Sequence, residues 1–138
     1  MIKNRYILSI DQGTTSSRAI IFDLNGEILA QKNFEFKQYF PKNGWVEHDP
    51  KEILETTTNA INHVIAESRI KATEICTAGI TNQRETVVAW DKSNGQPVYN
   101  AIVWQDRRTD EICKDLRNKN LTEDIQNKTG LIIDPYFS

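Results

Sequence analysis

The sequence lacks several features that would place it in a common functional class. Its 138 residues carry 17 Lys and Arg against 19 Asp and Glu, a formal net charge of -2. It therefore has no overall positive field to hold a nucleic acid or an anionic membrane. It has only 2 cysteines, Cys76 and Cys113, in no CxxC or metal-ligand spacing. We interpret both as reduced thiols in or near the core.

Long apolar runs are also missing. The N-terminal stretch is interrupted by Lys3, Asn4 and Arg5, and it is too short for a signal peptide or a membrane span. We therefore expect a cytoplasmic protein without membrane insertion. Hydrophobic residues make up 38% of the chain, which is enough for one folded domain with its own core.

The apolar pattern predicts a mixed α/β domain that opens with three antiparallel strands. These strands are expected over residues 6–11, 18–23 and 27–36. A helix is expected from Pro50, capped by Asp49, with an apolar face that extends to Ile65. A strand over residues 75–81 could pair parallel to the first strand. This order does not match the Rossmann type, in which each strand leads into a helix.

The remainder of the chain predicts a second hairpin and two helices. We expect hairpin strands over residues 86–90 and 101–104, with a turn at Ser93-Asn94-Gly95. Helices are expected over residues 107–116 and from Thr122 onward.

A polar loop after the first strand carries the richest chemistry. Gly13 lets the backbone approach a ligand closely, and the hydroxyls of Thr14, Thr15 and Ser16 can surround phosphate oxygens. Arg18 can neutralise phosphate charge, and Asp11 is placed to hold Mg²⁺. The loop lacks the Walker A lysine and spacing, and a strand follows it. The alternative is a hydroxyl-rich hairpin turn that binds nothing.

A second group of polar and aromatic residues follows the later strands. Arg84 and Glu85 offer donors and a charged acceptor for a small polyol, and Trp104 can pack against its carbon skeleton. Each residue also has a simpler interpretation. The charged pair could be exposed, Trp104 could belong to the core, Tyr136 could be a turn residue, and Asp106 could cap a helix beginning at Arg107.

Taken together, these segments resemble the FGGY carbohydrate kinases, and within them the members that phosphorylate glycerol. The resemblance covers essentially the whole chain, from YILSIDQGTTSSRAIIFD through PKNGWVEHDP, GITNQRET and YNAIVWQDRR to TGLIIDPYFS. The NQRET segment favours glycerol, because family members that act on xylulose or gluconate are not expected to carry it. The family fold is ribonuclease H-like, as in the actin-like ATPases, which agrees with the strand order above.

The resemblance implies a role for several residues. Thr14, Thr15, Ser16 and Arg18 would contact the phosphates of ATP, and Asp11 would help to place Mg²⁺. Arg84, Glu85 and Tyr136 would bind glycerol, and Trp104 would line its pocket. The reaction would yield sn-glycerol 3-phosphate and ADP.

The resemblance also implies that residues 1–138 are only part of the family's N-terminal domain. The general base and the C-terminal domain would lie beyond Ser138, so no residue here is given the catalytic role and the chain alone is expected to be inactive. We expect the complete protein to form a homo-oligomer. Two alternatives stay open: a non-catalytic binding or assembly fragment, and a kinase for another polyol or a ketose.

Overall fold

The computed structural model describes residues 5–137. These residues form two compact units. The first unit comprises residues 5–37 and 49–83, and the second comprises residues 38–48 and 84–137.

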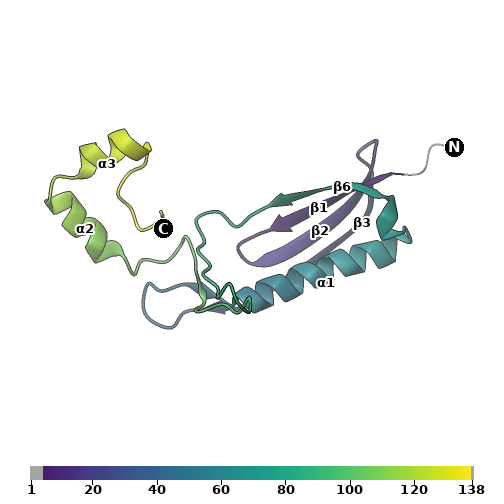
Figure 1. Cartoon of the computed structure of the whole chain (residues 1–138), viewed down its shortest axis with the longest axis horizontal. Coiled ribbons are helices and arrows are strands. Elements are labelled where there is room, and N and C mark those ends of the chain that lie inside the picture. Colours follow the sequence, from purple (N-terminus) through teal and green to yellow (C-terminus); the bar gives the residue numbers. More distant parts are fainter. Residues whose placement is uncertain (1–4, 138) are drawn as a thin grey trace. The chain divides into compact units, whose positions relative to one another are not determined.

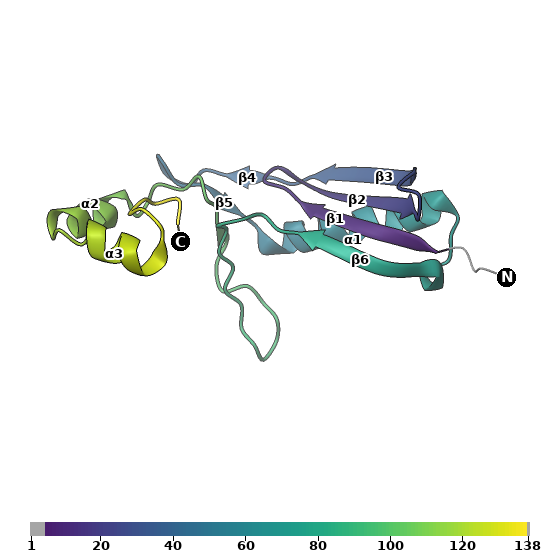
Figure 2. The same cartoon turned by 90° about the horizontal axis from the view of Figure 1, so that it is seen from above.

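The first unit is a four-stranded sheet with one long helix (Figures 1 and 2). Its elements are β1 (Tyr6–Gln12), β2 (Ser16–Asp23), β3 (Ile28–Glu35), α1 (Pro50–Ser68), the 3-10 turn η1 (Ala72–Glu74) and β6 (Ile75–Thr81). The strand order is β3-β2-β1-β6, with β1, β2 and β3 antiparallel and β6 parallel to β1. The predicted opening and the parallel return strand are therefore confirmed.

The core of the first unit lies between α1 and one face of the sheet. Alternate residues of β1, β2 and β3 point to α1 and are buried with two residues of the helix, a cluster made of Leu8, Ile10, Ala19, Ile21, Ala30, Ala60 and Val64. The helix begins where predicted, because the Asp49 carboxylate accepts the Lys51 amide at 2.8 Å and Pro50 occupies the first turn.

Strand β6 is the exposed edge of this sheet. Helix α1 contacts β1, β2 and β3, whereas every residue of β6 after Ile75 is exposed and Ile80 is 73% exposed. Cys76 is exposed on the same strand. The prediction of a core position is therefore wrong for Cys76 and right for Cys113, which is buried.

The second unit contains a small antiparallel sheet and two helices. Its elements are β4 (Gln38–Tyr39), β5 (Glu47–His48), β7 (Ala101–Ile102), α2 (Asp110–Asn118) and α3 (Thr122–Thr129), and its strand order is β4-β5-β7. The helix at Thr122 is confirmed, whereas the other helix begins at Asp110 instead of Arg107.

The predicted second hairpin is shorter than expected. Residues 86–90 form only two isolated bridges, Val87 to Ile102 and Trp90 to Pro97. Pro97 has no amide hydrogen to donate to a ladder. The partner strand ends after Ile102, because the Asp106 amide bonds the Val103 carbonyl at 2.8 Å and turns the chain.

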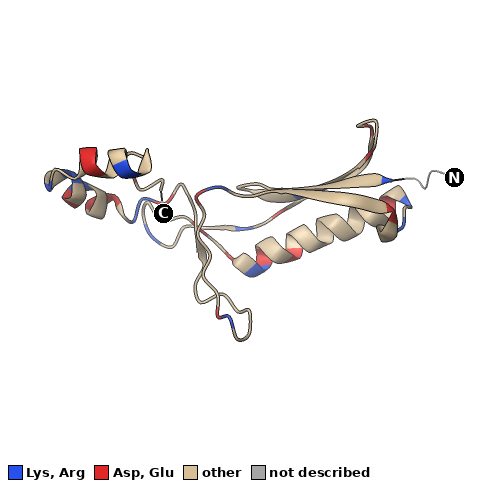
Figure 3. Cartoon of the chain, turned by 45° about the horizontal axis from the view of Figure 1, so that its top comes forward, with Lys and Arg blue, Asp and Glu red and all other residues tan. Residues whose placement is uncertain are grey.

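Charged residues of both signs are interspersed in each unit (Figure 3). Among residues 5–137, none of the helices combines the length and the apolar character needed to cross a membrane.

Candidate functional site

The loop between β1 and β2 is tightly closed. The Gly13 amide donates to the Ser16 carbonyl at 3.0 Å, and the Phe36 amide donates to the Thr15 carbonyl at 3.2 Å. A Cβ added to Gly13 would lie 3.1 Å from the Ser16 carbonyl oxygen, a backbone atom that cannot move aside alone. Glycine is therefore favoured here, because a Cβ would require the loop backbone to shift by a few tenths of an ångström.

A partly buried hydroxyl network holds the base of this loop against α1. The Ser17 hydroxyl donates to the Gln12 side-chain oxygen at 2.8 Å, and the Thr57 hydroxyl donates to the same oxygen at 2.7 Å. Ser17 also lies 2.9 Å from the Thr56 hydroxyl and is fully buried. The sequence pattern gave no signal for the two threonines, whose partners lie about 40 positions away in the chain.

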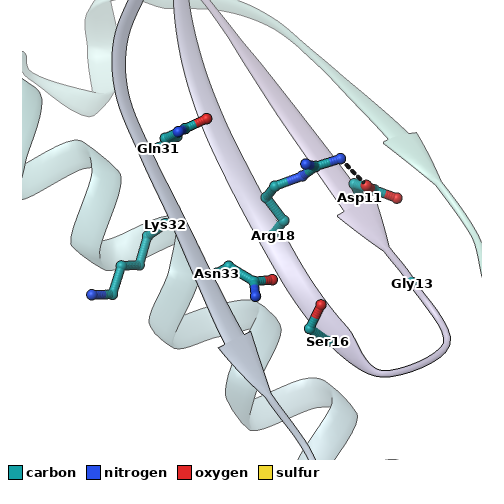
Figure 4. A pocket seen from close by; sticks show the side chains of 7 residues that line it. All are labelled: Asp11, Gly13, Ser16, Arg18, Gln31, Lys32 and Asn33. Atoms are coloured by element: carbon teal, nitrogen blue, oxygen red, sulfur yellow. Dashed lines mark hydrogen bonds and ion pairs between the residues drawn. The ribbon is translucent and has the colours of Figure 1, made fainter.

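Predicted phosphate-site residues gather on the opposite, open face of the same sheet. Asp11 and Arg18 are register partners across β1 and β2, and their side chains form an ion pair at 2.5 Å. Together with Gly13 and Ser16 they line a hollow of about 520 Å³ (Figure 4). Gln31 and Asn33 of β3 line the same hollow.

The other loop residues flank this hollow. Thr14 is half-buried and Thr15 is exposed at the tip of the loop. Lys32 also borders the hollow, but its side chain extends away from Asp11 and Arg18 in Figure 4, and its ammonium lies 5.4 Å from the Phe34 ring centroid. Arg18 is therefore the cation placed beside the acid in the hollow.

Asp11 suits a magnesium ion that keeps most of its own ligands. Its carboxylate is 34% exposed and supplies hard oxygen atoms. No group of three or more potential metal ligands occurs among residues 5–137. Mg²⁺ commonly binds through one or two carboxylates together with substrate phosphates and water. The chemistry of Asp11 fits such an ion. To bind it, the Asp11 carboxylate must either keep Arg18 as a second partner or break its ion pair with Arg18.

Trp104 and Tyr136, which were predicted to share a ligand, are in contact in the second unit. Their rings meet edge to face with centroids 5.7 Å apart, and both side chains are half-buried. Tyr136 also contacts Phe137, with centroids 5.0 Å apart. The Asp134 carboxylate accepts the Tyr136 amide at 2.9 Å and fixes the start of this segment. The aromatic pair offers a wall of the kind that packs against a sugar or polyol skeleton.

Arg84 and Glu85 lie in the same unit as the aromatic pair. Arg84 is exposed, and Glu85 is half-buried with a φ of 53°. A non-glycine residue in the left-handed region is held there at a cost, and such strain often occurs at functional sites. Glu85 and Phe137 border a largely apolar hollow of about 410 Å³.

A buried ionic cluster in the second unit was missed by sequence reasoning. Arg108 donates from Nε to one Asp106 oxygen at 2.9 Å and from an Nη to the other at 2.8 Å, and the same Nη lies 2.7 Å from the Glu47 carboxylate. The Asp106 and Glu47 side chains are only 3% and 4% exposed. We refer to these three residues as the carboxylate–arginine cluster.

The position of Asp106 corrects its interpretation as a helix cap. It does not cap α2, because that helix begins at Asp110 after Thr109; instead, its carboxylate accepts the Val46 amide at 2.7 Å. Arg108, two residues later, is also largely shielded from solvent, since its side chain is 14% exposed. The sequence signal was the close spacing of Trp104, Asp106 and Arg108, but nothing in it indicated a partner 61 positions earlier in the chain.

Electrostatics keep the cluster charged. Burial raises the pKa of the Glu47 carboxyl, but hydrogen bonds from Arg108, Asn100 and Tyr99 outweigh it and hold that pKa below its usual value. Burial likewise raises the pKa of the Asp106 carboxyl, and bonds from the Arg108 side chain and from two backbone amides lower it further than burial raises it. The Asp106 carboxylate in turn raises the pKa of Arg108.

The sheet of the first unit, with three antiparallel strands followed by a helix and a parallel strand, is the opening of a ribonuclease H-like, actin-like ATPase fold. Residues 6–138 match the FGGY family of carbohydrate kinases, N-terminal domain. The chain belongs to this family.

Named relatives agree with this assignment. The chain is 60% identical over 134 residues to a glycerol kinase of Petrotoga mobilis and 57% identical to glycerol kinase 1 of Clostridium tetani. Each match covers 97% of this chain and 27% of the relative. The chain therefore spans about a quarter of the length of the curated relatives that it matches.

Solved structures show the same similarity. The glycerol kinase of Plasmodium falciparum with ADP superimposes with a TM-score of 0.90 at 42% identity, covering 98% of this chain and 27% of that one. A gluconate kinase from Lactobacillus acidophilus gives a TM-score of 0.87 at 25% identity, over 96% of this chain and 26% of that one. The fold is thus shared across the family, while sequence identity is higher to the glycerol kinase.

Proposed function

We propose that the complete protein containing this chain transfers the γ-phosphate of ATP to a terminal hydroxyl of glycerol, giving sn-glycerol 3-phosphate and ADP. The observation that carries this proposal is the 60% identity to a protein named glycerol kinase over 97% of the chain. The NQRET segment and the contact between Trp104 and Tyr136 support the same substrate. We also propose that the complete protein is cytoplasmic and forms a homo-oligomer.

The loop of the first unit is proposed to bind the nucleotide phosphates. Thr14, Thr15 and Ser16 supply hydroxyls and amides, and Arg18 supplies a positive charge for the transferring group. Asp11 would hold Mg²⁺, which spreads the phosphate charge when it is bound. Asp11 and Arg18 form an ion pair with each other. When a metal–nucleotide complex binds, we expect the Asp11 carboxylate to contact the cation and the Arg18 guanidinium to contact the phosphates.

The second unit is proposed to bind glycerol. Arg84 donates to glycerol hydroxyls and Glu85 accepts from them, while Trp104 and Tyr136 pack against the carbon chain. Glycerol has a hydroxyl on every carbon, so hydrogen bonds to two of them leave the third free to react. A site built on such hydrogen bonds discriminates strongly against analogues that lack the bonded hydroxyls.

The reaction forms one bond from oxygen to phosphorus and breaks one. The terminal hydroxyl oxygen of glycerol attacks the γ-phosphorus, the β–γ bridging oxygen leaves with ADP, and the hydroxyl proton passes to a general base. We assign that base to a residue outside this chain. Residues 1–138 on their own are therefore proposed to bind ligands weakly and to catalyse nothing.

Substitution of Arg84 tests the proposed glycerol site. Because Arg84 is exposed, Arg84→Ala should leave stability within about 0.5 kcal/mol. A hydrogen bond from a charged group contributes about 1.5–3 kcal/mol, so the substitution should reduce kcat/KM for glycerol roughly 10- to 150-fold, with the KM for ATP unchanged. Lys92→Ala removes another exposed cation of the same unit and serves as the matched control. Unchanged glycerol kinetics in Arg84→Ala would remove this residue from the site.

A further inference from the structure

The turn that carries Trp104 is anchored to the segment before β5. The Val103 amide donates to the Val46 carbonyl at 3.1 Å, and the Arg107 amide donates to the Gly44 carbonyl at 2.7 Å. Trp104 lies between these two anchors. Its backbone position therefore depends on residues 44–46, which are far away in the sequence.

The carboxylate–arginine cluster joins the same two segments, the turn at residues 103–106 and the segment at residues 44–46, through side chains. The Asp106 carboxylate accepts the Val46 amide at 2.7 Å and the Arg108 amide at 2.8 Å. Arg108 then connects Asp106 to Glu47, the residue after Val46. Its guanidinium also stacks on the Trp45 ring, 3.7 Å from the centroid. The cluster thus joins both ends of the turn to one short segment.

A third segment joins the cluster through Glu47. The Tyr99 hydroxyl donates to one Glu47 oxygen at 2.9 Å, and the Asn100 amide group donates to the other at 3.0 Å. Buried ion pairs contribute little to stability relative to well-packed apolar residues, but their hydrogen bonds have defined directions. The planar fork of arginine is suited to holding two carboxylates in one geometry. We therefore expect the cluster to matter more for fixing the position of the turn than for the stability of the fold.

We propose that Glu47, Asp106 and Arg108 are positioning residues that fix the orientation of Trp104 toward the polyol. The proposal rests on the proposed function, because it takes glycerol as the ligand packed against Trp104. None of the three residues is assigned a contact with substrate. They act through the turn at residues 103–106 and through the segment at residues 44–46.

A double-mutant cycle in the complete protein tests this role. Arg108→Lys keeps the charge but loses the fork, and Trp104→Phe removes the side chain that the cluster positions. We expect Arg108→Lys to raise the KM for glycerol about tenfold, since small misplacements of a positioning group can cost up to about 10²-fold. The KM for ATP should stay within about twofold. In the Trp104→Phe background, Arg108→Lys should have little further effect.

A purely structural role would give a different result. Arg108→Lys would then lower the fraction of active enzyme and change the KM values of both substrates. The fold-changes of the two single substitutions would multiply in the double variant. Glu47→Gln, which keeps the side-chain size, provides a second variant if Arg108→Lys folds poorly, and the same rise in glycerol KM is expected. Lys114→Met, which breaks an exposed pair with Glu111, is the control and should leave both KM values unchanged.

The outcomes separate the two proposals. Suppose that the wild-type protein phosphorylates glycerol, but the effects of the two substitutions are additive in free energy or the glycerol KM is unchanged in Arg108→Lys. The positioning role is then overturned, and the proposed function stays intact. A wild-type protein that does not phosphorylate glycerol overturns both.

Discussion

Replacing Arg108 by methionine is expected to loosen the second unit specifically. The substitution keeps an unbranched, partly apolar side chain but removes the only cation that bonds both Asp106 and Glu47 among the described residues. Each carboxylate keeps some partners, namely the Val46 amide for Asp106 and the Tyr99 hydroxyl for Glu47. Both carboxyl groups remain almost fully buried without their shared cation. Each must either stay ionised at a desolvation cost or take up a proton.

Loss of one partner from a buried ion pair costs about 3–5 kcal/mol. Such a loss is a large part of the 5–15 kcal/mol that stabilises an ordinary domain. With about 1.4 kcal/mol for each factor of ten, amides protected by this cluster should exchange with solvent roughly 10²- to 4 × 10³-fold faster. The amides of Val46 and Val103 are the natural reporters, since both bond across the connection.

Hydrogen exchange of the complete protein measures this effect locally. Arg108→Lys should lie between wild type and Arg108→Met, because it restores the charge without the fork. Peptides from α1 in the first unit should exchange as in wild type. An acceleration of less than about fivefold at Val46 and Val103 would correspond to about 1 kcal/mol, the value of an exposed pair, and would refute the inference of a tightly coupled buried cluster.

Three further predictions concern pH, the loop and the isolated chain. The pKa values of Glu47 and Asp106 are lowered in the folded state. Their contribution to the free energy of unfolding should therefore be complete above the unfolded pKa of about 4 and lost as the pH falls through the folded pKa values. The urea midpoint, measured as the pH is lowered, checks this. Gly13→Ala should raise the KM for ATP several-fold with the glycerol KM unchanged, since the added Cβ would crowd the Ser16 carbonyl. Residues 1–138 alone should self-associate through the exposed edge strand β6, where Ile80 is uncovered, as sedimentation at several concentrations would show.

Each of these expectations has a clear contradiction. A urea midpoint that does not change between pH 7 and pH 3 would remove the linkage assigned to the two carboxylates. Gly79→Ala adds a Cβ that meets nothing within 4 Å, so it should be neutral, and an equal ATP effect in both glycine variants would mean that close packing at Gly13 is not the cause. A single monomeric species over a wide concentration range would exclude association through β6.

Local sequence signals were sufficient for most of the first unit. Alternation in the strands and the Asp49-Pro50 helix start each act within a few residues, and both lie where predicted. The exposure of Cys76 was not predictable in this way. An apolar strand indicates burial in general, but which strands α1 covers depends on packing between distant segments.

Predicting the second unit required contacts that no local pattern reports. The charged pair Arg107-Arg108 looks like any exposed helix start. Yet the Arg108 side chain is only 14% exposed, because Glu47, 61 positions earlier, lies beside it. The start of α2 was predicted three residues too early for the same reason, since Asp106 is engaged with Val46 and is not available as a cap. Trp104 and Tyr136 were grouped through the family resemblance, and the structure places them in contact.

The most direct test of the proposed function is the turnover of alternative acceptors by the complete protein with ATP and Mg²⁺. Phosphorus NMR of the reaction mixture should show glycerol 3-phosphate and ADP appearing together from glycerol. With xylulose or gluconate at the same concentration, kcat/KM should be lower by at least about 10²-fold, because a site shaped for a three-carbon polyol would have to take additional carbons and, for gluconate, a carboxylate charge. Comparable or faster turnover of xylulose or gluconate would contradict the assignment of glycerol as the substrate.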